Sequence, residues 1–173
     1  MDVEQLKIDV DFMIQAMKEA QAAAEEGEVP VGCVIVADEG VVKGSASGKS
    51  SSKKKAAASV GRIIARAHNL TETLKDPTAH AEMQAITSAS AYLGGKYLDK
   101  CTLYVTVEPC PMCAAALNWS QIGRVVYGCA DPKRGASRFS PNLYHPKTEI
   151  TGGILEKECS QMITGFFSKK RKK

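Results

Sequence analysis

The segment Asp76–Glu82, "DPTAHAE", places one of only three histidines two residues before a glutamate. The Asp-Pro pair breaks the preceding segment and predicts the start of a helix, with Asp76 as its cap and Pro77 in its first turn. Residues two apart on a regular helix point to nearly opposite sides. His80 and Glu82 can therefore share one site only if His80 lies at the irregular start of that helix.

A second segment, Val107–Cys113, reads "VEPCPMC" and carries two of the six cysteines. Pro111 suits the first position of a helix, which would put Cys110 near the cap and Cys113 in the first turn. Residues three apart share one face of a helix, so both sulfurs can reach one ion. A helix N-terminus also favours negative charge and so lowers the pKa of a thiol.

These two segments together predict a catalytic zinc site, with one Zn²⁺ per subunit bound by His80, Cys110 and Cys113. Three protein ligands leave the fourth position of zinc to water, as in catalytic rather than structural zinc sites. A carboxylate beside that water can take its proton and pass it to a leaving group. The pattern therefore predicts a hydrolytic enzyme in which Glu82 moves the proton.

Two other interpretations of the cysteine pair stay open. Cys-x-x-Cys in an α/β protein is also typical of thioredoxin-like redox pairs, although that interpretation leaves "HAE" unexplained. A structural zinc clip in a binding module would need a fourth ligand, for which His68 and His145 are candidates. The remaining cysteines have no metal-ligand spacing to the pair, and Cys101 and Cys129 are expected to be small core residues.

Helical and strand patterns alternate along the chain, which predicts an α/β fold with helices on both faces of a sheet. The first helix is expected to start near Asp9 or Asp11 and to end at Gly27. Strand 29–37 follows, and we favour Arg62–His68 over 40–46 as its hairpin partner, which leaves about 39–60 as a basic low-complexity insertion. The later elements are expected to be a helix over 78–93, a strand over 101–107, a helix over 111–119, a strand over 123–129, a loop over 131–147 and an amphipathic helix over 154–167.

The length of 173 residues suits a single domain, predicted over residues 1–168, followed by a basic tail at 169–173. No apolar run approaches the roughly 20 residues of a membrane span, and the acidic N-terminus fits no export signal, so we expect a cytoplasmic protein with reduced cysteines. The net charge of +4 is concentrated in the tail and at Lys53–Lys55. Both clusters are either solvated surface or attract a phosphate backbone.

His-x-Glu followed by Pro-Cys-x-x-Cys is the signature of the zinc-dependent nucleobase deaminases. Across most of its length the chain resembles the bacterial tRNA-specific adenosine deaminases. That resemblance implies a cytidine-deaminase-like, three-layer α/β/α fold with a mixed sheet of about five strands, and a homodimer. It further implies a tRNA anticodon stem-loop as the substrate, with the wobble adenosine converted to inosine. The stretches that carry it are "EVPVGCVIV", "RAHN", "DPTAHAEMQAI", "TLYVTVEPCPMC", "IGRVVYGCADPKRGA", "HPKTEITGGI" and "CSQMITGFF".

The resemblance also assigns roles to residues of this chain. His80, Cys110 and Cys113 would bind zinc, Glu82 would be the proton shuttle, and Asn69 would hydrogen-bond the target base. The loop over 131–147 mixes cations and aromatic rings, as RNA contacts require. Its candidate RNA-contact residues are Lys133, Arg134, Arg138, Phe139 and Tyr144. Trp119 is either an anchor of the dimer or a core residue.

Two alternatives to this function remain. "PCPMC" also resembles the bacterial guanine deaminases, so the chain could act on a free base such as guanine or cytosine. It could also be a non-catalytic RNA-binding subunit that keeps zinc for structure, although the presence of Glu82 favours activity. The cationic loop and tail favour RNA over a free base, because a small neutral substrate has no need of them. The basic insertion is not part of the family's usual pattern.

Overall fold

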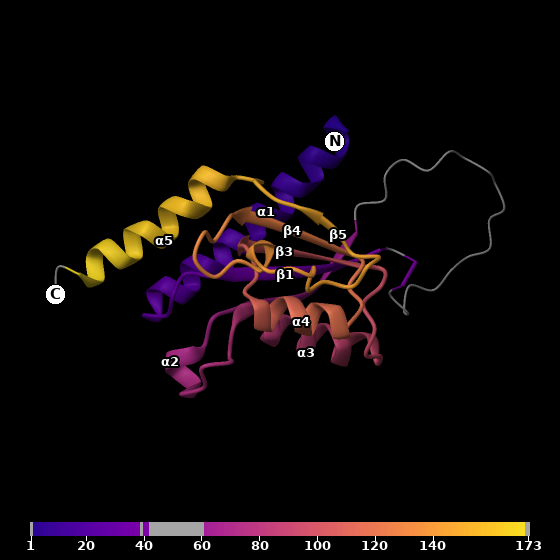
Figure 1. Cartoon of the computed structure of the whole chain (residues 1–173), viewed down its shortest axis with the longest axis horizontal. Coiled ribbons are helices and arrows are strands. Elements are labelled where there is room, and N and C mark those ends of the chain that lie inside the picture. The colour runs from indigo at the N-terminus through magenta and orange to yellow at the C-terminus, as the bar shows by residue number, and fades with distance from the viewer. Residues whose placement is uncertain (1, 39, 42–60, 172–173) are drawn as a thin grey trace.

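A mixed sheet of five strands forms the centre of the computed structural model, which describes residues 2–38, 40–41 and 61–171 (Figure 1). Its strand order is β2-β1-β3-β4-β5. β1 pairs antiparallel with both β2 and β3, whereas β3, β4 and β5 run parallel. The predicted fold class and the hairpin of β1 with Arg62–His68 are confirmed. The strands are β1 (Gly32–Ala37), β2 (Arg62–His68), β3 (Cys101–Val107), β4 (Arg124–Cys129) and β5 (Glu149–Thr151).

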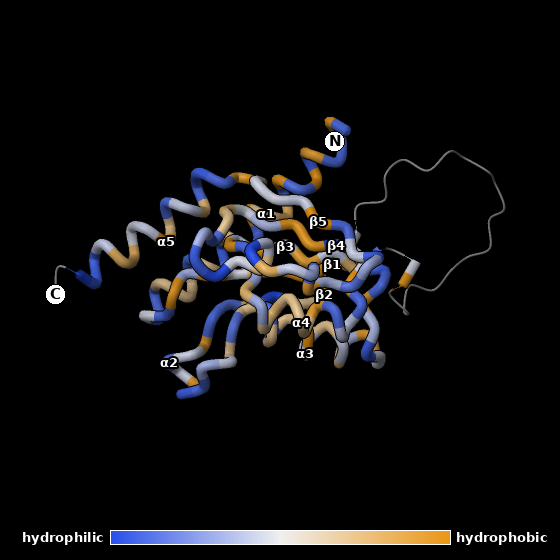
Figure 2. Tube along the Cα trace, in the orientation of Figure 1, coloured by the Kyte–Doolittle hydropathy of each residue, from blue (hydrophilic) through white to orange (hydrophobic). Residues whose placement is uncertain are grey.

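Helices cover both faces of this sheet (Figure 1). One face carries α1 (Val3–Glu25) and α5 (Glu156–Lys170), and the other carries α3 (Ala81–Leu93) and α4 (Pro111–Trp119). The short helix α2 (Thr71–Leu74) lies between β2 and α3. Figure 2 shows that the central strands are mostly hydrophobic, whereas α2 is mostly hydrophilic. No helix within the described ranges is long and apolar enough to cross a bilayer.

All six residues of β1 are buried, because both of its faces are covered by helices. Successive side chains of a strand point to opposite faces of the sheet. Cys33 and Ile35 accordingly pack in the core beneath α3 and α4, whereas Val34 and Val36 pack in the core beneath α1 and α5. The same alternation explains why the strand appears in the sequence as an unbroken apolar run.

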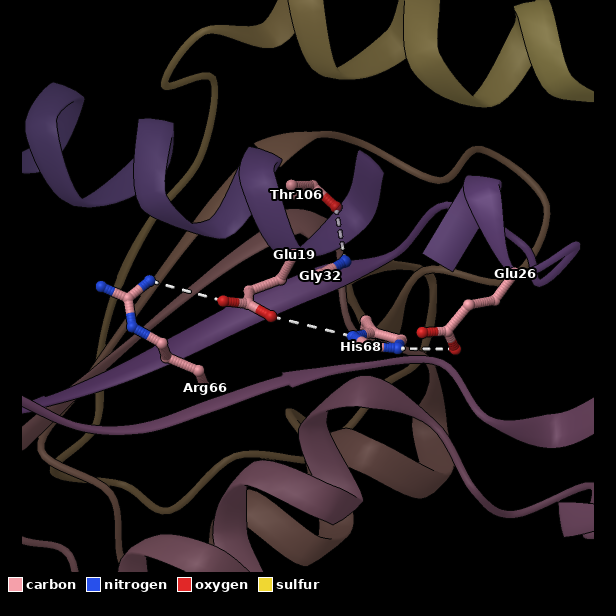
Figure 3. A network of polar contacts seen from close by, with 6 residues as sticks. All are labelled: Glu19, Glu26, Gly32, Arg66, His68 and Thr106. Carbon is pink, nitrogen blue, oxygen red and sulfur yellow. Dashed lines mark hydrogen bonds and ion pairs between the residues drawn. The ribbon is translucent and has the colours of Figure 1, made fainter. Parts of the chain in front are cut away.

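α1 approaches β1 closely at Gly32. A Cβ atom there would lie 2.2 Å from the backbone nitrogen of Ala20 and 2.4 Å from the carbonyl oxygen of Ala16, so only glycine fits. Both alanines are fully buried. The backbone N–H of Gly32 also donates to the Thr106 hydroxyl at 3.2 Å, which joins β1 to β3 (Figure 3).

The prediction that Asp9 or Asp11 starts the first helix is wrong, because α1 begins at Val3. Asp9 lies inside the helix, and its side chain is fully buried against the sheet. Both of its carboxylate oxygens accept hydrogen bonds of 2.7 Å from the Arg124 guanidinium of β4. Tyr104 donates a third bond at 3.0 Å. Asp9 is therefore a buried ionic contact between α1 and the sheet rather than a helix cap.

Three further expectations can be compared with the structure: the number of strands, the basic tail and the insertion. The expected sheet of about five strands is confirmed, although the sequence patterns located only four; β5 is three residues long and pairs with β4 through Arg124–Val126. Helix α5 continues to Lys170, so the first two residues of the basic tail are helical. The expected insertion at 39–60 lies outside the described residues except for Gly40 and Val41.

We expect Asp9→Asn to lower the free energy of unfolding by about 3 kcal/mol, because it leaves the partly buried Arg124 charge without its partner. Equilibrium unfolding in urea would measure the change. Glu4→Gln removes the same charge from an exposed site on the same helix and should change stability by less than about 0.5 kcal/mol. If the Asp9→Asn protein were as stable as the Glu4→Gln protein, Asp9 would not be a stabilising ionic contact of Arg124.

The contribution of Asp9 should also depend on pH. Burial raises the pKa of Asp9, but the hydrogen bonds and charge of Arg124 outweigh that effect and leave the pKa below its ordinary value of 3.8. A depressed carboxyl pKa stabilises the folded state above the ordinary value, and the stabilisation is lost as the pH falls through the folded pKa. The stability difference between the unaltered chain and Asp9→Asn should therefore be constant near neutrality and shrink below about pH 4.

Candidate active site and metal centre

Three side chains that could hold a metal come together at the starts of α3 and α4. They are His80, Cys110 and Cys113, whose ligand atoms all lie within 4.8 Å of one another. The His80 Nδ1 atom is 3.7 Å from the Cys110 sulfur and 3.5 Å from the Cys113 sulfur. A tetrahedral zinc ion with its usual bond lengths would hold nitrogen and sulfur ligands about 3.6 Å apart. The spacing and the chemistry of these donors therefore fit zinc.

Two helices begin at these ligands. His80 is the N-cap of α3, and its backbone is extended, with φ −71° and ψ 155°. Cys110 is the N-cap of α4, and Pro111 takes the first helical position, as the sequence predicts. Because both helix N-termini face the same point, their dipoles favour the negative charge of thiolate ligands there.

The prediction that Asp76 caps the helix of His80 is wrong. α3 begins at Ala81, and the Asp76 carboxylate instead accepts hydrogen bonds from the backbone and hydroxyl of Thr78 at 2.8 and 2.7 Å. Aspartate commonly stabilises such a local turn two residues ahead of itself. Asp76 therefore shapes the approach to His80 rather than the helix itself.

Asn69 takes part in starting α3. Its Oδ1 atom accepts a hydrogen bond of 3.1 Å from the backbone N–H of Ala81, the first residue of the helix. Its own N–H donates to the carbonyl of Val31, beside β1, at 3.1 Å. The side chain is 7% exposed. Asn69 thus fixes the start of α3 relative to the sheet, and its contact with a substrate base stays a prediction.

Glu82 is buried beside the metal ligands, with only 3% of its surface exposed. Its Oε2 atom has no hydrogen-bond partner among the described residues, where the only other buried side-chain atom in that state is the Tyr144 hydroxyl. Burial raises the pKa of Glu82. Leaving a buried carboxylate oxygen unpaired is costly for folding, so such atoms mark groups that have a partner in function.

The ligands are also tuned electrostatically. Hydrogen bonds from Cys113 and His80 lower the pKa of Cys110 to about 4, despite the opposing effect of burial. The hydrogen bond with Cys110 in turn raises the pKa of His80, and the nearby positive charge of Arg134 opposes that rise. A thiolate is the form that binds metal, so Cys110 is ready to bind a cation. The hydrogen bond between Cys110 and Cys113 raises the pKa of Cys113, which therefore keeps its proton until a cation replaces it.

The fourth ligand that a structural zinc clip would need is absent from the described part of the chain. His68 instead contacts Glu26 at 3.2 Å and Glu19 at 3.7 Å, in a network that also includes Arg66 (Figure 3). The His145 Nδ1 atom accepts a hydrogen bond from the backbone of Lys147. Neither histidine is among the clustered ligands, so the three that are there leave one coordination position open.

The loop after β4 presents cations near this site. Lys133, Arg134 and Arg138 are all exposed, and the Arg138 guanidinium is held by the carbonyl of Pro132. Phe139 is about half exposed. Tyr144 departs from the expected RNA-contact surface, because its ring is buried in the core beneath α3 and α4. Its place in an apolar core explains the difference, since the mixed composition of the loop does not distinguish buried rings from exposed ones.

Trp119 ends α4 and is 84% exposed, so the expectation that it is a core residue is wrong for the described chain. It lines a half-open groove of about 460 Å³. The other residues that line the groove are Lys96, Tyr97, Ala115, Asn118, Gln121 and His145. A contact of Trp119 with a second subunit stays a prediction.

Sequence reasoning missed two buried glutamates that hold the site's loops. Glu28 is fully buried and accepts hydrogen bonds from the backbone of Thr73 at 2.7 Å and of Glu72 at 3.1 Å, which anchors α2 ahead of His80. Burial raises the pKa of Glu28, but these bonds more than offset it and leave the pKa lowered. Glu108, just before the Pro-Cys motif, anchors the cationic loop in a similar way. The sequence signal that could have revealed both is an acidic residue beside a buried strand, since Glu28 comes four residues before β1 and Glu108 directly after β3.

Comparisons with known proteins agree on one family. Residues 6–129 match the cytidine and deoxycytidylate deaminase zinc-binding region. The tRNA-specific adenosine deaminase of Bacillus subtilis is 42% identical over 167 residues, which cover 94% of this chain and 90% of that protein.

Two solved structures extend the comparison. One, from a study of A-to-I editing by tRNA:A34 deaminases at the wobble position, is 37% identical with a TM-score of 0.71, covering 88% of this chain and 98% of that one. A guanine deaminase from Bacillus subtilis is 33% identical with a TM-score of 0.54, covering 75% of this chain and 66% of that one. The tRNA deaminase structure is thus the better match in both extent and shape.

We expect Cys113→Ser to weaken zinc binding by more than the roughly 10- to 100-fold that is typical when a ligand loses a hydrogen-bond partner, because it removes one of the three ligand atoms themselves. Metal analysis after dialysis against graded concentrations of a chelator would measure it. Cys129→Ser is the matched control, since Cys129 lies outside the cluster and its sulfur contacts the carbonyl of Thr106. Equal zinc retention by the two variants would refute the ligand assignment.

Proposed function

Because the chain belongs to the cytidine and deoxycytidylate deaminase family, and within it to the tRNA-specific adenosine deaminases, we propose that it deaminates adenosine to inosine at the wobble position of a tRNA anticodon. The observation that carries this proposal is the three-ligand cluster beside the buried carboxylate of Glu82, one oxygen of which has no partner among the described residues. The likeness to tRNA deaminases over nearly the whole chain supports the choice of substrate.

His80, Cys110 and Cys113 would hold one zinc ion. That ion, when bound, would supply a hydrolytic nucleophile at neutral pH by acidifying water. Glu82 would take one proton from the attacking water and deliver it to N1 of the adenine. It would then take the second proton, from the hydroxyl added at C6, and deliver it to the departing amine. Adenosine and water are consumed, and inosine and ammonia are formed. The raised pKa of Glu82 suits a group that must both accept and release a proton.

Asn69 would orient the target base. Among the described residues only the Oδ1 atom of its side chain is engaged, by the N–H of Ala81, so the Nδ2 atom is left to donate to the base. The bond to Ala81 holds the side chain in one orientation. Asn69 and Glu82 would therefore keep a constant spacing, because both are fixed to the first turn of α3.

The target adenosine has to leave its stack to enter a buried site, and a single-stranded anticodon loop permits this at small cost. Lys133, Arg134 and Arg138 would contact the phosphates around it, and the exposed ring of Phe139 would stack on a neighbouring base. The basic tail, Lys169–Lys173, would add phosphate contacts. Tyr144 is too buried to join them without rearrangement.

We also propose that the enzyme is a cytoplasmic homodimer. Trp119 is 84% exposed and lies in the same groove as Tyr97, which is 49% exposed. Exposed aromatic residues grouped in this way are typical of protein interfaces. The outer surface of α4 is therefore the proposed contact between subunits.

Deamination of free guanine is the second candidate, favoured by the 33% identity with a guanine deaminase. The cationic loop beside the site counts against it, because a neutral base gains little from nearby positive charge. A non-catalytic zinc-containing subunit is less favoured still, because Glu82 occupies the position that chemistry requires and would be a costly burial otherwise.

The test is inosine formation in an anticodon stem-loop RNA that carries adenosine at the wobble position. Free guanine, cytosine and adenosine are assayed in parallel. Inosine at that one position would support the proposal. Ammonia released only from a free base would replace it with a nucleobase deaminase.

In the same assay we expect Glu82→Ala to keep its zinc and its fold while turnover falls by at least about 10²- to 10⁴-fold, the contribution typical of a general acid–base group. Metal analysis and circular dichroism would establish that the site and fold persist. Near-normal turnover in this variant would exclude Glu82 as the proton shuttle.

A further inference from the structure

The side chain of Glu108 accepts hydrogen bonds from both ends of the loop 131–137. It lies between β3 and α4, two residues before the ligand Cys110, and only 5% of its surface is exposed. Its Oε2 atom accepts a hydrogen bond of 3.0 Å from the backbone of Asp131, and its Oε1 atom accepts one of 2.8 Å from the backbone of Ser137. Hydrogen bonds to a charged carboxylate are about twice as strong as neutral ones.

The loop closes around this carboxylate. A Cβ atom at Gly135 would lie 2.2 Å from the Oε2 atom of Glu108, so the contact has no room for a side chain there. The N–H of Ala136 donates to the carbonyl of Pro109 at 2.9 Å. The loop is therefore docked on both the side chain of Glu108 and the main chain of Pro109, next to a metal ligand.

Two cationic residues, Lys133 and Arg134, lie in the middle of the loop 131–137. The Oδ1 atom of Asp131 accepts hydrogen bonds from the backbone of Lys133 at 2.9 Å and of Arg134 at 3.0 Å, which fixes the turn that carries them. Both side chains are exposed. Arg134 is close enough to His80 for its charge to act on that ligand. A turn held by hydrogen bonds thus places positive charge close to the metal ligands.

We infer that Glu108 is a positioning residue for RNA recognition: it holds Lys133 and Arg134 where the phosphates beside the target adenosine pass the metal site. This inference rests on the proposed function. Phosphate contacts fix the register of a nucleic acid, so the cations must have defined places relative to the metal site. Without the carboxylate the loop loses its bonds from Asp131 and Ser137 and keeps only the main-chain bond from Ala136 to Pro109. The metal ligands are still held by the starts of α3 and α4.

The test is Glu108→Gln, which keeps the size of the side chain but turns an NH₂ group toward one of the two backbone N–H donors. We expect KM for the stem-loop RNA to rise about tenfold, and the plot of log Kd against log salt to become shallower by about 1. The value of kcat and the zinc content should stay within about twofold. Binding is measured in a Glu82→Ala background, so that the RNA is not consumed.

Gly135→Ala disturbs the same contact from the loop side and should produce the same changes. Each variant has a matched control. Glu4→Gln makes the same charge change on the exposed surface of α1, and Gly95→Ala adds a Cβ atom with nothing within 4 Å of it. Both controls should leave KM and the salt dependence unchanged.

A double-mutant cycle separates positioning from general damage. If Glu108 acts through the cations, then Glu108→Gln should add little to the effect of Lys133→Ala with Arg134→Ala, since residues in one network are not additive. Additive effects, or zinc and kcat lost together, would overturn the inference in favour of a structural role. An unchanged KM in both Glu108→Gln and Gly135→Ala, with RNA deaminated normally, would overturn the inference alone. No deamination of the RNA by the unaltered chain would overturn the proposed function and, with it, this inference.

Discussion

The N-termini of α3 and α4 converge on one point, and the geometry of the site depends on that convergence. His80 and Glu82 face the same region because the backbone of His80 is extended and the helix begins only at Ala81. Cys110 and Cys113 share a face because α4 begins between them. Had α3 started a residue earlier, the backbone of His80 would be helical and its side chain would point to nearly the opposite side from Glu82. The loops that enter these helices therefore have to be fixed as firmly as the helices themselves.

Polar side chains provide that fixation, each by binding the backbone of a neighbouring segment. Asn69 holds the first residue of α3, Glu28 holds α2, and Glu108 holds the loop after β4. All three are buried, and each of their bonds offsets part of the cost of burial. Glu82 is the contrast, because one of its oxygens has no such partner. The buried side chains that hold the loops of the site are thus hydrogen-bonded, whereas Glu82, the residue proposed to act in catalysis, keeps one buried oxygen unpaired. Such a loss of stability is expected at a functional site.

Much of the fold and the metal cluster could be predicted because their signals are local. Pro111 predicts the start of α4, and the apolar run at 29–37 predicts β1. The failures involve partners distant in sequence or features too short for a pattern. Asp9 resembles a helix cap until Arg124, 115 residues away, is seen to pair with it. β5 is only three residues long, and such a strand has no periodicity to detect. Burial alone separates Tyr144 from Phe139, and their sequence context does not reveal it.

The separation of Asp9 from Arg124 also bears on how the chain folds. The contacts that join α1, β1, β3 and β4 link residues up to 115 positions apart, whereas Asn69 and Ala81 are separated by only 12. Contacts between distant segments require large loops to close before any stabilisation is gained, which slows folding. The starts of α3 and α4 come together only where the sheet beneath them has formed. We therefore expect a metal ion to enter late in folding, at a site whose shape the sheet has already set.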